Sequence, residues 1–205
     1  MLTVYLVEDD PLLARHVLAA FQRARGLRCV GHAARLAQAR DELPFFRPDV
    51  LLTDLGLPDG DAIELIRELN EPQQAWRPHI LVFSVFGDEG RVLEAIESGA
   101  DGYFLKGCTD EELVGAVTGA ARGESPISPG IARQLLRRLG TSAPQTRAML
   151  SPAEQSVLRL VAQGYVTEEV GERLMMTAHT VAAHVRAVYG KLHPVREAAC
   201  ARVAP

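Results

Sequence analysis

The sequence predicts an α/β module with a doubly wound, five-stranded parallel sheet, followed by a small all-α module that contains a helix-turn-helix. Three observations support this prediction. Five short apolar runs alternate with five helical patterns over residues 1–121, as in a parallel sheet covered by helices. Residues 148–205 show helical patterns only. Between them, residues 122–147 contain many Gly, Pro and Ser residues, which indicates a linker.

The five strands of the first module are expected at 4–7, 27–30, 50–53, 80–83 and 103–105. Asp10 and Pro11 can cap and begin the first helix. A second helix is expected at about 35–43, with Pro44 as its end. Three more are expected at 61–69, 88–97 and 110–121, and Thr109 with Glu112 forms a capping box for the last.

The linker and the second module follow from capping and breaking residues. In the linker, Pro129 and Gly130 are expected to break structure, and a short basic helix is expected at 131–139. Ser151 and Glu154 then form a capping box with a proline at the first helical position. A short helix at 167–174 and a longer one from Thr177 to Leu192, stopped by Pro194, complete the helix-turn-helix outline.

Composition limits the classes of protein that fit. The net charge of −4 divides into −9 for residues 1–121 and +5 for residues 122–205, so the two modules are expected to have different partners. No run approaches the roughly 18 apolar residues of a membrane span, and Glu8 argues against a signal peptide. The three cysteines lack the spacing of metal ligands. We therefore expect a cytoplasmic protein with no membrane association.

Polar residues follow four of the expected strands. Glu8 and Asp9 follow the first strand, Asp54 the third, Ser84 the fourth and Lys106 the fifth. In an open parallel sheet, the residues just past the strand ends meet at one edge. Carboxylates, a hydroxyl and an ammonium at that edge are the groups that a metal-assisted phosphate site uses.

These residues resemble those of a two-component receiver domain, which has a flavodoxin-like fold, over residues 1–121. The resemblance implies that Asp54 is the phosphoacceptor and that a sensor histidine kinase is the phosphodonor. It further implies that Ser84 and Lys106 stabilise the phosphoryl group, and that Tyr103 is the aromatic switch residue. The segment 55–58 matches the turn after the phosphoacceptor.

Metal chemistry agrees with these roles. Mg²⁺, or Mn²⁺, prefers oxygen ligands and retains several waters. We expect Asp9 and Asp54 to bind the cation directly, Glu8 to bind it through water, and the Gly56 carbonyl to be a further ligand.

The haloacid-dehalogenase-like phosphatases also form an aspartyl phosphate, but they place a second aspartate two residues after the nucleophile. Gly56 occupies that position here, and the chain lacks a cap domain. We therefore expect a phosphoacceptor that transfers and hydrolyses its own phosphoryl group, and not an enzyme with a turnover substrate.

Residues 149–192 resemble the LuxR-type helix-turn-helix, and the whole chain resembles the NarL/FixJ-type response regulators. The sequence departs from the family pattern in the segment expected to face DNA, at Val166, Glu168, Gly171, Ala182 and Gly190. Residues 148–205 have a net charge of only +1. The resemblance implies DNA contacts from His179, Thr180, Ala182, Ala183, Arg186 and Lys191.

The sequence therefore predicts a phosphorylation-dependent transcriptional regulator that binds promoter DNA and forms a homodimer when phosphorylated. An alternative stays open. The same phosphoswitch can use its C-terminal helices for protein–protein contacts, with weak or no DNA binding, because the charge on the DNA-facing side is low.

Overall fold

The computed structural model describes residues 1–71, 73–85, 89–124, 127, 129–140 and 150–192. Its strands are β1 (Leu2–Val7), β2 (Leu27–Ala33), β3 (Val50–Thr53), β4 (Gly56–Leu57), β5 (Gly60–Asp61), β6 (His79–Ser84) and β7 (Gly102–Leu105). Its helices are α1 (Pro11–Arg23), α2 (Leu36–Phe46), α3 (Ala62–Leu69), α4 (Glu89–Ser98), α5 (Asp110–Ala121), α6 (Pro129–Gly140), α7 (Pro152–Ala162), α8 (Thr167–Leu174) and α9 (Ala178–Leu192). The expected helix start at Asp88 and the expected stop at Pro194 lie outside the described residues.

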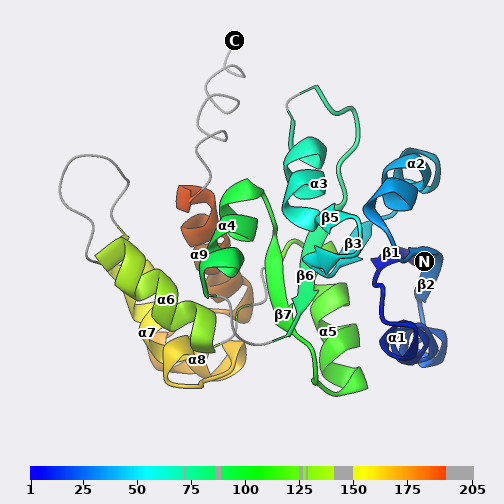
Figure 1. The fold of residues 1–205 in the computed structure, drawn as a ribbon. Helices are drawn as coiled ribbons and strands as arrows, with labels where there is room; N and C mark the ends of the chain where they lie inside the picture. Colours follow the sequence, from blue (N-terminus) through cyan, green and yellow to red (C-terminus); the bar gives the residue numbers. More distant parts are fainter. Residues whose placement is uncertain (72, 86–88, 125–126, 128, 141–149, 193–205) are drawn as a thin grey trace, which may run out of the picture.

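The first module is a five-stranded parallel sheet with the strand order β2-β1-β3-β6-β7. The predicted doubly wound α/β fold is thus confirmed. The strand order reverses at β1, so the chain builds the sheet outward in both directions from β1 and β3 (Figure 1). The crevice at the carboxyl ends of β1 and β3 is therefore the place where such a sheet binds ligands.

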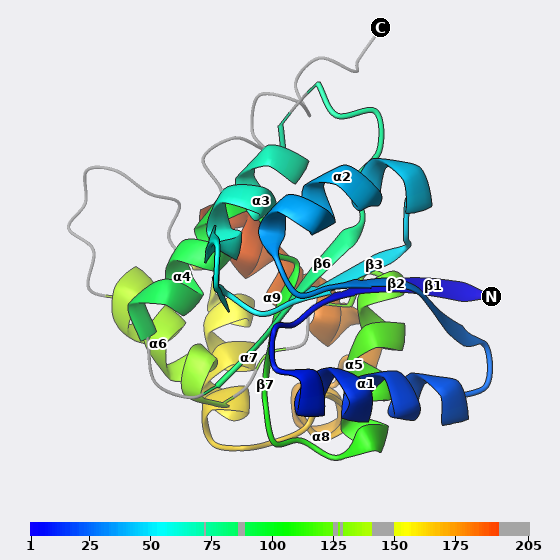
Figure 2. The same cartoon turned by 45° about the vertical axis from the view of Figure 1, so that its right-hand side comes forward.

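Helices cover both faces of this sheet (Figure 2). On one face, Val4, Leu6 and Leu81 pack with Val17 and Phe21 of α1, in a cluster that includes residues of α5. On the other face, residues of β1, β3 and β6 pack against α2, α3 and α4. Successive strand residues point to opposite faces, so strands that are covered on both sides are mainly apolar, as Val50, Leu51 and Leu52 of β3 are. The buried hydroxyl of Thr53, at the end of this strand, donates to the Asp54 carbonyl at 2.8 Å.

Capping residues begin the helices as the sequence predicts. The Asp10 carboxylate accepts hydrogen bonds from the backbone N–H groups of Leu12 and Leu13, and Thr109 with Glu112 forms the predicted capping box of α5. Asp61 is the N-cap of α3 and not its first helical residue. Each of these side chains accepts from backbone N–H groups that have no partner inside the helix.

The prediction that Pro44 ends the second helix is wrong. Helix α2 continues through Pro44 to Phe46 and ends at Arg47, which has a left-handed backbone (φ 42°). The Arg47 N–H donates to the Leu43 carbonyl at 2.9 Å and closes the last turn. Phe46 also packs against the Tyr5 ring, with the ring centroids 6.0 Å apart. A proline one turn from the helix end removes few hydrogen bonds, and tertiary packing compensates for this loss.

A small antiparallel hairpin, β4–β5, was not predicted. It follows Asp54 directly and pairs Gly56 with Asp61 and Leu57 with Gly60. The Ala62 N–H donates to the Leu55 carbonyl at 2.9 Å and closes the loop at its base. Residues 55–62 therefore form an ordered turn beside the carboxylate edge of the sheet.

The C-terminal module is all-helical, as predicted, with α7, α8 and α9 in mutual contact. The expectation that Pro129 and Gly130 break structure is wrong, because both residues lie in the first turn of α6. Proline is well tolerated there, since its missing N–H would have no partner in the helix. Helix α6 contacts α7. No described helix is both long enough and apolar enough to cross a membrane.

The two modules touch each other. Helix α4 of the first module contacts α9 of the second module and α6 of the linker (Figures 1 and 2). One apolar cluster runs through both, from Ile96 of α4 to Leu135 of α6 and Val185 of α9. The longer helix of the helix-turn-helix therefore lies against the α/β module in this structure.

Candidate functional sites

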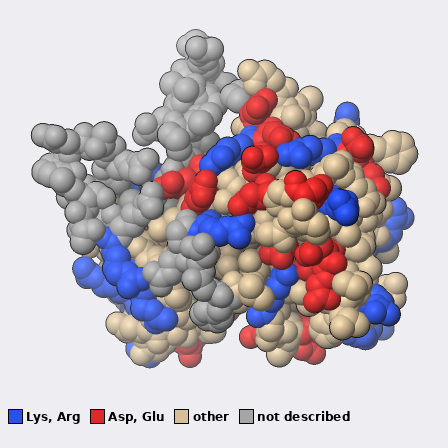
Figure 3. Space-filling model, viewed as in Figure 1, with Lys and Arg blue, Asp and Glu red and all other residues tan. Residues whose placement is uncertain are grey.

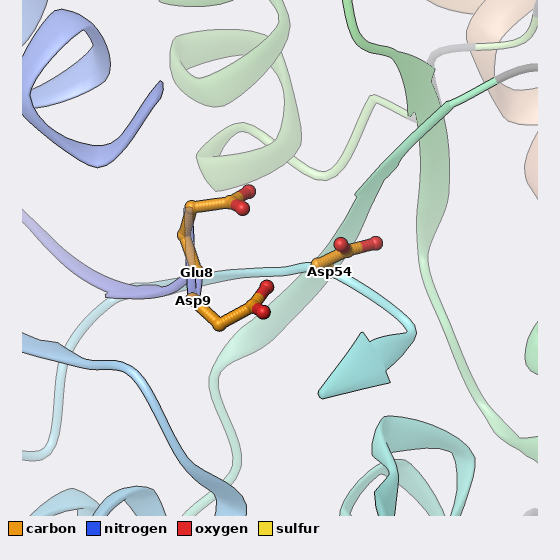
Figure 4. Close-up of side chains that lie close together, drawn as sticks. All are labelled: Glu8, Asp9 and Asp54. Carbon is orange, nitrogen blue, oxygen red and sulfur yellow. The ribbon is translucent and has the colours of Figure 1, made fainter. Parts of the chain in front are cut away.

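Three carboxylates meet at the carboxyl ends of β1 and β3. Glu8 and Asp9 directly follow β1 and Asp54 directly follows β3. One carboxylate oxygen from each residue lies within 4.8 Å of the others. Figure 4 shows the three side chains side by side. Glu8 is fully buried, Asp54 is 8% exposed, and Asp9 is exposed. The structure thus brings together the acidic residues that the sequence placed at one edge of the sheet.

Lys106 lies between two of these carboxylates. Its Nζ is 2.8 Å from Asp54 Oδ2 and 2.8 Å from Glu8 Oε2, and it donates a hydrogen bond to Glu8 Oε1 at 3.0 Å. Burial by itself would lower the pKa of this ammonium, but the hydrogen bonds to Asp54 and Glu8 outweigh burial and raise the pKa. Lys106 is therefore a permanent positive charge beside Asp54.

The donor set fits a hard divalent cation. Glu8 Oε2 is buried and, although it lies near the Lys106 ammonium, it has no hydrogen bond of acceptable geometry. A buried carboxylate oxygen with unused acceptor capacity is unfavourable unless water or a cation satisfies it. Together with Asp9 and Asp54 it supplies only oxygen donors, which is the ligand type that Mg²⁺ prefers.

The remaining predicted residues of this site lie on neighbouring elements. Ser84 ends β6 and is half-buried, and its carbonyl accepts a hydrogen bond from the Lys106 N–H at 2.8 Å. Tyr103 lies in β7 and is 3% exposed. Gly56 is in the β4–β5 hairpin and is exposed. Thus every predicted residue of the site lies at, or directly beside, the carboxyl edge of the sheet, except the more deeply placed Tyr103.

Two neighbours of the site are not evident from the sequence. The Nε2 atom of His32 is 2.9 Å from the Glu8 carbonyl oxygen, which fixes the backbone at the end of β1. Asp59, in the turn after Asp54, accepts hydrogen bonds from the N–H groups of Leu36 and Ala37 at the start of α2, and these bonds lower the pKa of its carboxyl group. Their partners are more than 20 residues away in the sequence, so no local pattern signals either contact.

The predicted DNA-contacting residues lie on α9, but not all on its exposed side. His179, Ala183 and Arg186 are exposed, whereas Thr180 and Lys191 are half-buried and Ala182 is only 7% exposed. A Cβ atom placed on Gly123, just after α5, would lie 2.9 Å from Arg186 Nη2. Arg186 therefore lies against the backbone where the linker begins, and α9 also contacts α4 of the first module.

Charge is distributed unevenly over the surface. Figure 3 shows most of the acidic side chains over the α/β module, with basic ones among them, and basic side chains alone over the region where Figure 1 places α6. Helix α6 carries three arginines and no acid. Helix α8, the short helix of the helix-turn-helix, carries Glu168, Glu169 and Glu172, all exposed, and one arginine.

Comparison with known proteins assigns both modules. The family model of the response regulator receiver domain matches residues 4–118, and that of the bacterial regulatory proteins of the luxR family matches residues 148–204. The nitrate/nitrite response regulator NarL of Escherichia coli is 33% identical over 93% of this chain and 88% of its own length. The transcriptional activator DevR/DosR of Mycobacterium tuberculosis is 30% identical over 94% of this chain and 88% of its own length.

Solved structures agree with this assignment. A LuxR-family two-component response regulator from Aurantimonas has a TM-score of 0.60 at 29% identity, covering 66% of this chain and 96% of that one. The RcsB response regulator of Salmonella typhimurium has a TM-score of 0.61 at 22% identity, covering 94% and 93%, a likeness that shows the fold alone.

The chain belongs to the response regulators of the NarL/FixJ type, which join a receiver domain to a LuxR-type helix-turn-helix domain. It is a phosphorylation-dependent, DNA-binding transcription regulator of a two-component system.

Proposed function

We propose that Asp54 is the phosphoacceptor of this regulator, that a sensor histidine kinase supplies the phosphoryl group, and that Mg²⁺ bound by Asp9, Asp54 and the Gly56 carbonyl assists the transfer. Glu8 would hold the cation through water. The observation that carries this proposal is the contact of Lys106 Nζ with Asp54 Oδ2 at 2.8 Å, beside two further carboxylates. A phosphoacceptor needs this combination of an accessible carboxylate oxygen and fixed positive charge.

The protein groups have separate tasks in this reaction. An Asp54 carboxylate oxygen attacks phosphorus in line, the P–O bond forms, and the bond from phosphorus to the imidazole nitrogen of the donor breaks. The Lys106 ammonium and the Ser84 hydroxyl stabilise the phosphoryl oxygens. The cation, when bound, neutralises further charge on these oxygens. Water later hydrolyses the aspartyl phosphate. Gly56 stands where the phosphatases have their second aspartate, so we infer a phosphoacceptor and not an enzyme with a turnover substrate.

The output of the switch follows from the placement of α9. Since α9 contacts α4 and Arg186 lies against Gly123, we infer that α9 leaves the receiver when the protein binds DNA. We infer that phosphorylation shifts Ser84 and Tyr103, weakens the contact between α4 and α9, and favours a homodimer that binds promoter DNA in the cytoplasm.

A second candidate function is supported by the acidic surface of α8. Helix α8, which contacts α9, carries three exposed glutamates. Their negative charge repels DNA phosphates and would attract a basic protein partner. In this case the phosphoswitch would control a protein–protein contact. A mobility-shift assay at low salt, with genomic fragments and phosphorylated protein, separates the two candidates. Binding supports the transcriptional role, and its absence supports the protein-contact role.

The phosphoacceptor assignment is tested by labelling. Acetyl phosphate with Mg²⁺ should label the wild-type protein with an acid-labile group, detected as an added phosphoryl mass by intact mass spectrometry. Asp54→Asn should remove this label, because an amide cannot form the acyl phosphate. Asp59→Asn is the matched control, since Asp59 lies in the same turn but caps α2, and it should leave labelling intact. Equal labelling of the Asp54 variant would place the nucleophile elsewhere.

A further inference from the structure

An ion pair joins α4 to the hairpin that follows the phosphoacceptor. The Arg91 Nη2 atom, in the first turn of α4, donates a hydrogen bond to Asp61 Oδ2 at 2.5 Å. Both side chains are a little more than one-third exposed, at 37% and 39%. An ion pair of this exposure adds little to global stability. Its location, however, connects two elements that both bear on the site.

Asp61 is the direct neighbour of Gly56 across the hairpin. The two residues are antiparallel partners in the β4–β5 pairing, and Gly56 supplies the backbone carbonyl that we propose as a cation ligand. The other carboxylate oxygen of Asp61, Oδ1, accepts from the Ile63 N–H at 3.0 Å and caps α3. Asp61 therefore uses one oxygen to begin α3 and the other to hold α4.

Arg91 also lies beside Gly56 itself. A Cβ atom placed on Gly56 would be 3.8 Å from Arg91 Nη1, which is an ordinary contact distance. The guanidinium therefore reaches both residues of this antiparallel pair. Any movement of α4 away from the hairpin would remove this support from the loop that carries the Gly56 carbonyl.

We propose that Arg91 is a positioning residue for the cation site: through Asp61, it holds the hairpin of residues 56–61 where the Gly56 carbonyl faces the cation. This inference rests on the proposed function of Asp54 and its neighbours. Because α4 also contacts α9, cation binding and the position of the DNA-binding helix become linked, and the linkage acts in both directions.

Charge and position predict opposite effects for Arg91. If Arg91 acted only through its charge, removing it would tighten Mg²⁺ binding, because a nearby positive charge repels the cation. If Arg91 positions the hairpin, removing it weakens Mg²⁺ binding. For Asp61, both effects predict weaker binding. The sign of the change in the Arg91 variant therefore identifies its role.

The experiment is calorimetric titration of the full-length protein with MgCl₂. Arg91→Ala and Asp61→Asn should each weaken Mg²⁺ binding by roughly tenfold, as loss of an outer-shell partner commonly does. Asparagine keeps the α3 cap, so the second variant removes mainly the charge. The double variant should bind no more weakly than either single variant, since both remove the same contact. Arg91→Lys, which keeps the charge, should recover part of the affinity.

Arg67→Ala is the matched control. Arg67 Nη2 is 2.8 Å from Glu94 Oε1, so this variant removes an equal charge and another ion pair between α3 and α4, without touching the hairpin. Its Mg²⁺ affinity should equal that of the wild-type protein. Thermal unfolding of every variant, followed by circular dichroism, establishes that the fold is retained.

The outcomes separate this inference from the function on which it rests. Unchanged or tighter Mg²⁺ binding by Arg91→Ala would overturn the positioning role, while wild-type binding and Asp54 labelling stay in place. An Arg67→Ala effect equal to that of Arg91→Ala would also overturn it, because the effect would then be general to α4. Failure of the wild-type protein to bind Mg²⁺ would instead contradict the proposed phosphoacceptor site.

Discussion

Lys191 Nζ lies 2.5 Å from Glu154 Oε2, and this contact joins the last turn of α9 to the first turn of α7. The Glu154 side chain is 6% exposed, and the same oxygen accepts a hydrogen bond from the Ser151 N–H. Lys191 was predicted to contact DNA phosphates. That role stays a prediction, but the ammonium would have to leave a buried carboxylate to perform it, so a structural role competes with DNA contact.

Replacement of Lys191 distinguishes these roles. Lys191→Met should destabilise the C-terminal domain by about 3 kcal/mol, because it leaves a buried carboxylate without its cation. The double variant with Glu154→Gln should recover much of this loss, since neither charge then remains. Urea denaturation followed by circular dichroism measures the change. Unchanged stability, together with a DNA salt dependence whose slope falls by about 0.9, would make Lys191 a phosphate contact instead.

The same pair predicts how the domain responds to acid. Burial would raise the pKa of the Glu154 carboxyl group, but hydrogen bonds from Lys191 and Ser151 outweigh burial and lower the pKa. A pKa lowered by folding means that the pair stabilises the domain above the pKa of the unfolded chain, about 4.3, and that this stabilisation is lost as the pH falls through the folded value. In the Glu154→Gln variant, the free energy of unfolding should fall less than in the wild type between pH 6 and about pH 3, as measured by denaturation at each pH. A Glu154 variant with the same acid sensitivity as the wild type would contradict the assignment.

Lys106 should be needed for the conformational response to phosphorylation and not for phosphoryl transfer itself. Lys106→Ala should still accept phosphate slowly, because Asp54 and the cation ligands remain, but it should fail to dimerise or to change its tryptic protection. The chain has two lysines, Lys106 and Lys191, so protein labelled with [13Cε]lysine gives two assignable NMR signals. On phosphorylation the Lys106 signal should move, as its ammonium exchanges Glu8 for phosphoryl oxygens. If Lys106→Ala dimerised and changed its tryptic protection as the wild type does, Lys106 would have only a structural role.

The carboxylates after β1 should differ in their importance for the cation. Asp9→Ala should weaken Mg²⁺ binding more than Glu8→Ala, since Asp9 is exposed and has direct access, whereas the charge of Glu8 is already balanced by Lys106. Removal of the cation with EDTA should stop labelling by acetyl phosphate altogether. Calorimetric titration measures the affinities. Equal affinities in the two variants would refute direct coordination by Asp9.

DNA binding is expected to be weak and to depend strongly on salt. Ala182→Lys should tighten it and steepen the plot of log affinity against log salt by about 0.9, if residue 182 faces a phosphate. Ala182 is 7% exposed here, on the helix that contacts α4, and a lysine ammonium resists burial. If the receiver covers residue 182, the variant should also bind DNA with less need for phosphorylation. Ala183→Lys, at an exposed neighbouring position, is the matched control for added charge. No change in affinity or slope would favour the protein-contact function.

Residue patterns alone predict the sheet, most of the helices and the convergence of Glu8, Asp9, Asp54 and Lys106. Apolar periodicity and capping residues act over one or two turns, so they can be recognised locally. The convergence also needs no coordinates, because parallel strands bring their carboxyl ends to one edge. The local rules failed at Pro44 and at Pro129, where a proline near a helix end has a position-dependent effect that composition does not show.

The pairing of distant side chains follows from the tertiary fold and from no local pattern. Arg91 and Asp61 are 30 residues apart, and Lys191 and Glu154 are 37 apart. The contact of α9 with α4 and the approach of Arg186 to Gly123 likewise join segments that are far apart in the sequence. Such contacts depend on how whole elements pack, and packing is set by the shapes and distances of many side chains together. No single stretch of sequence contains that information.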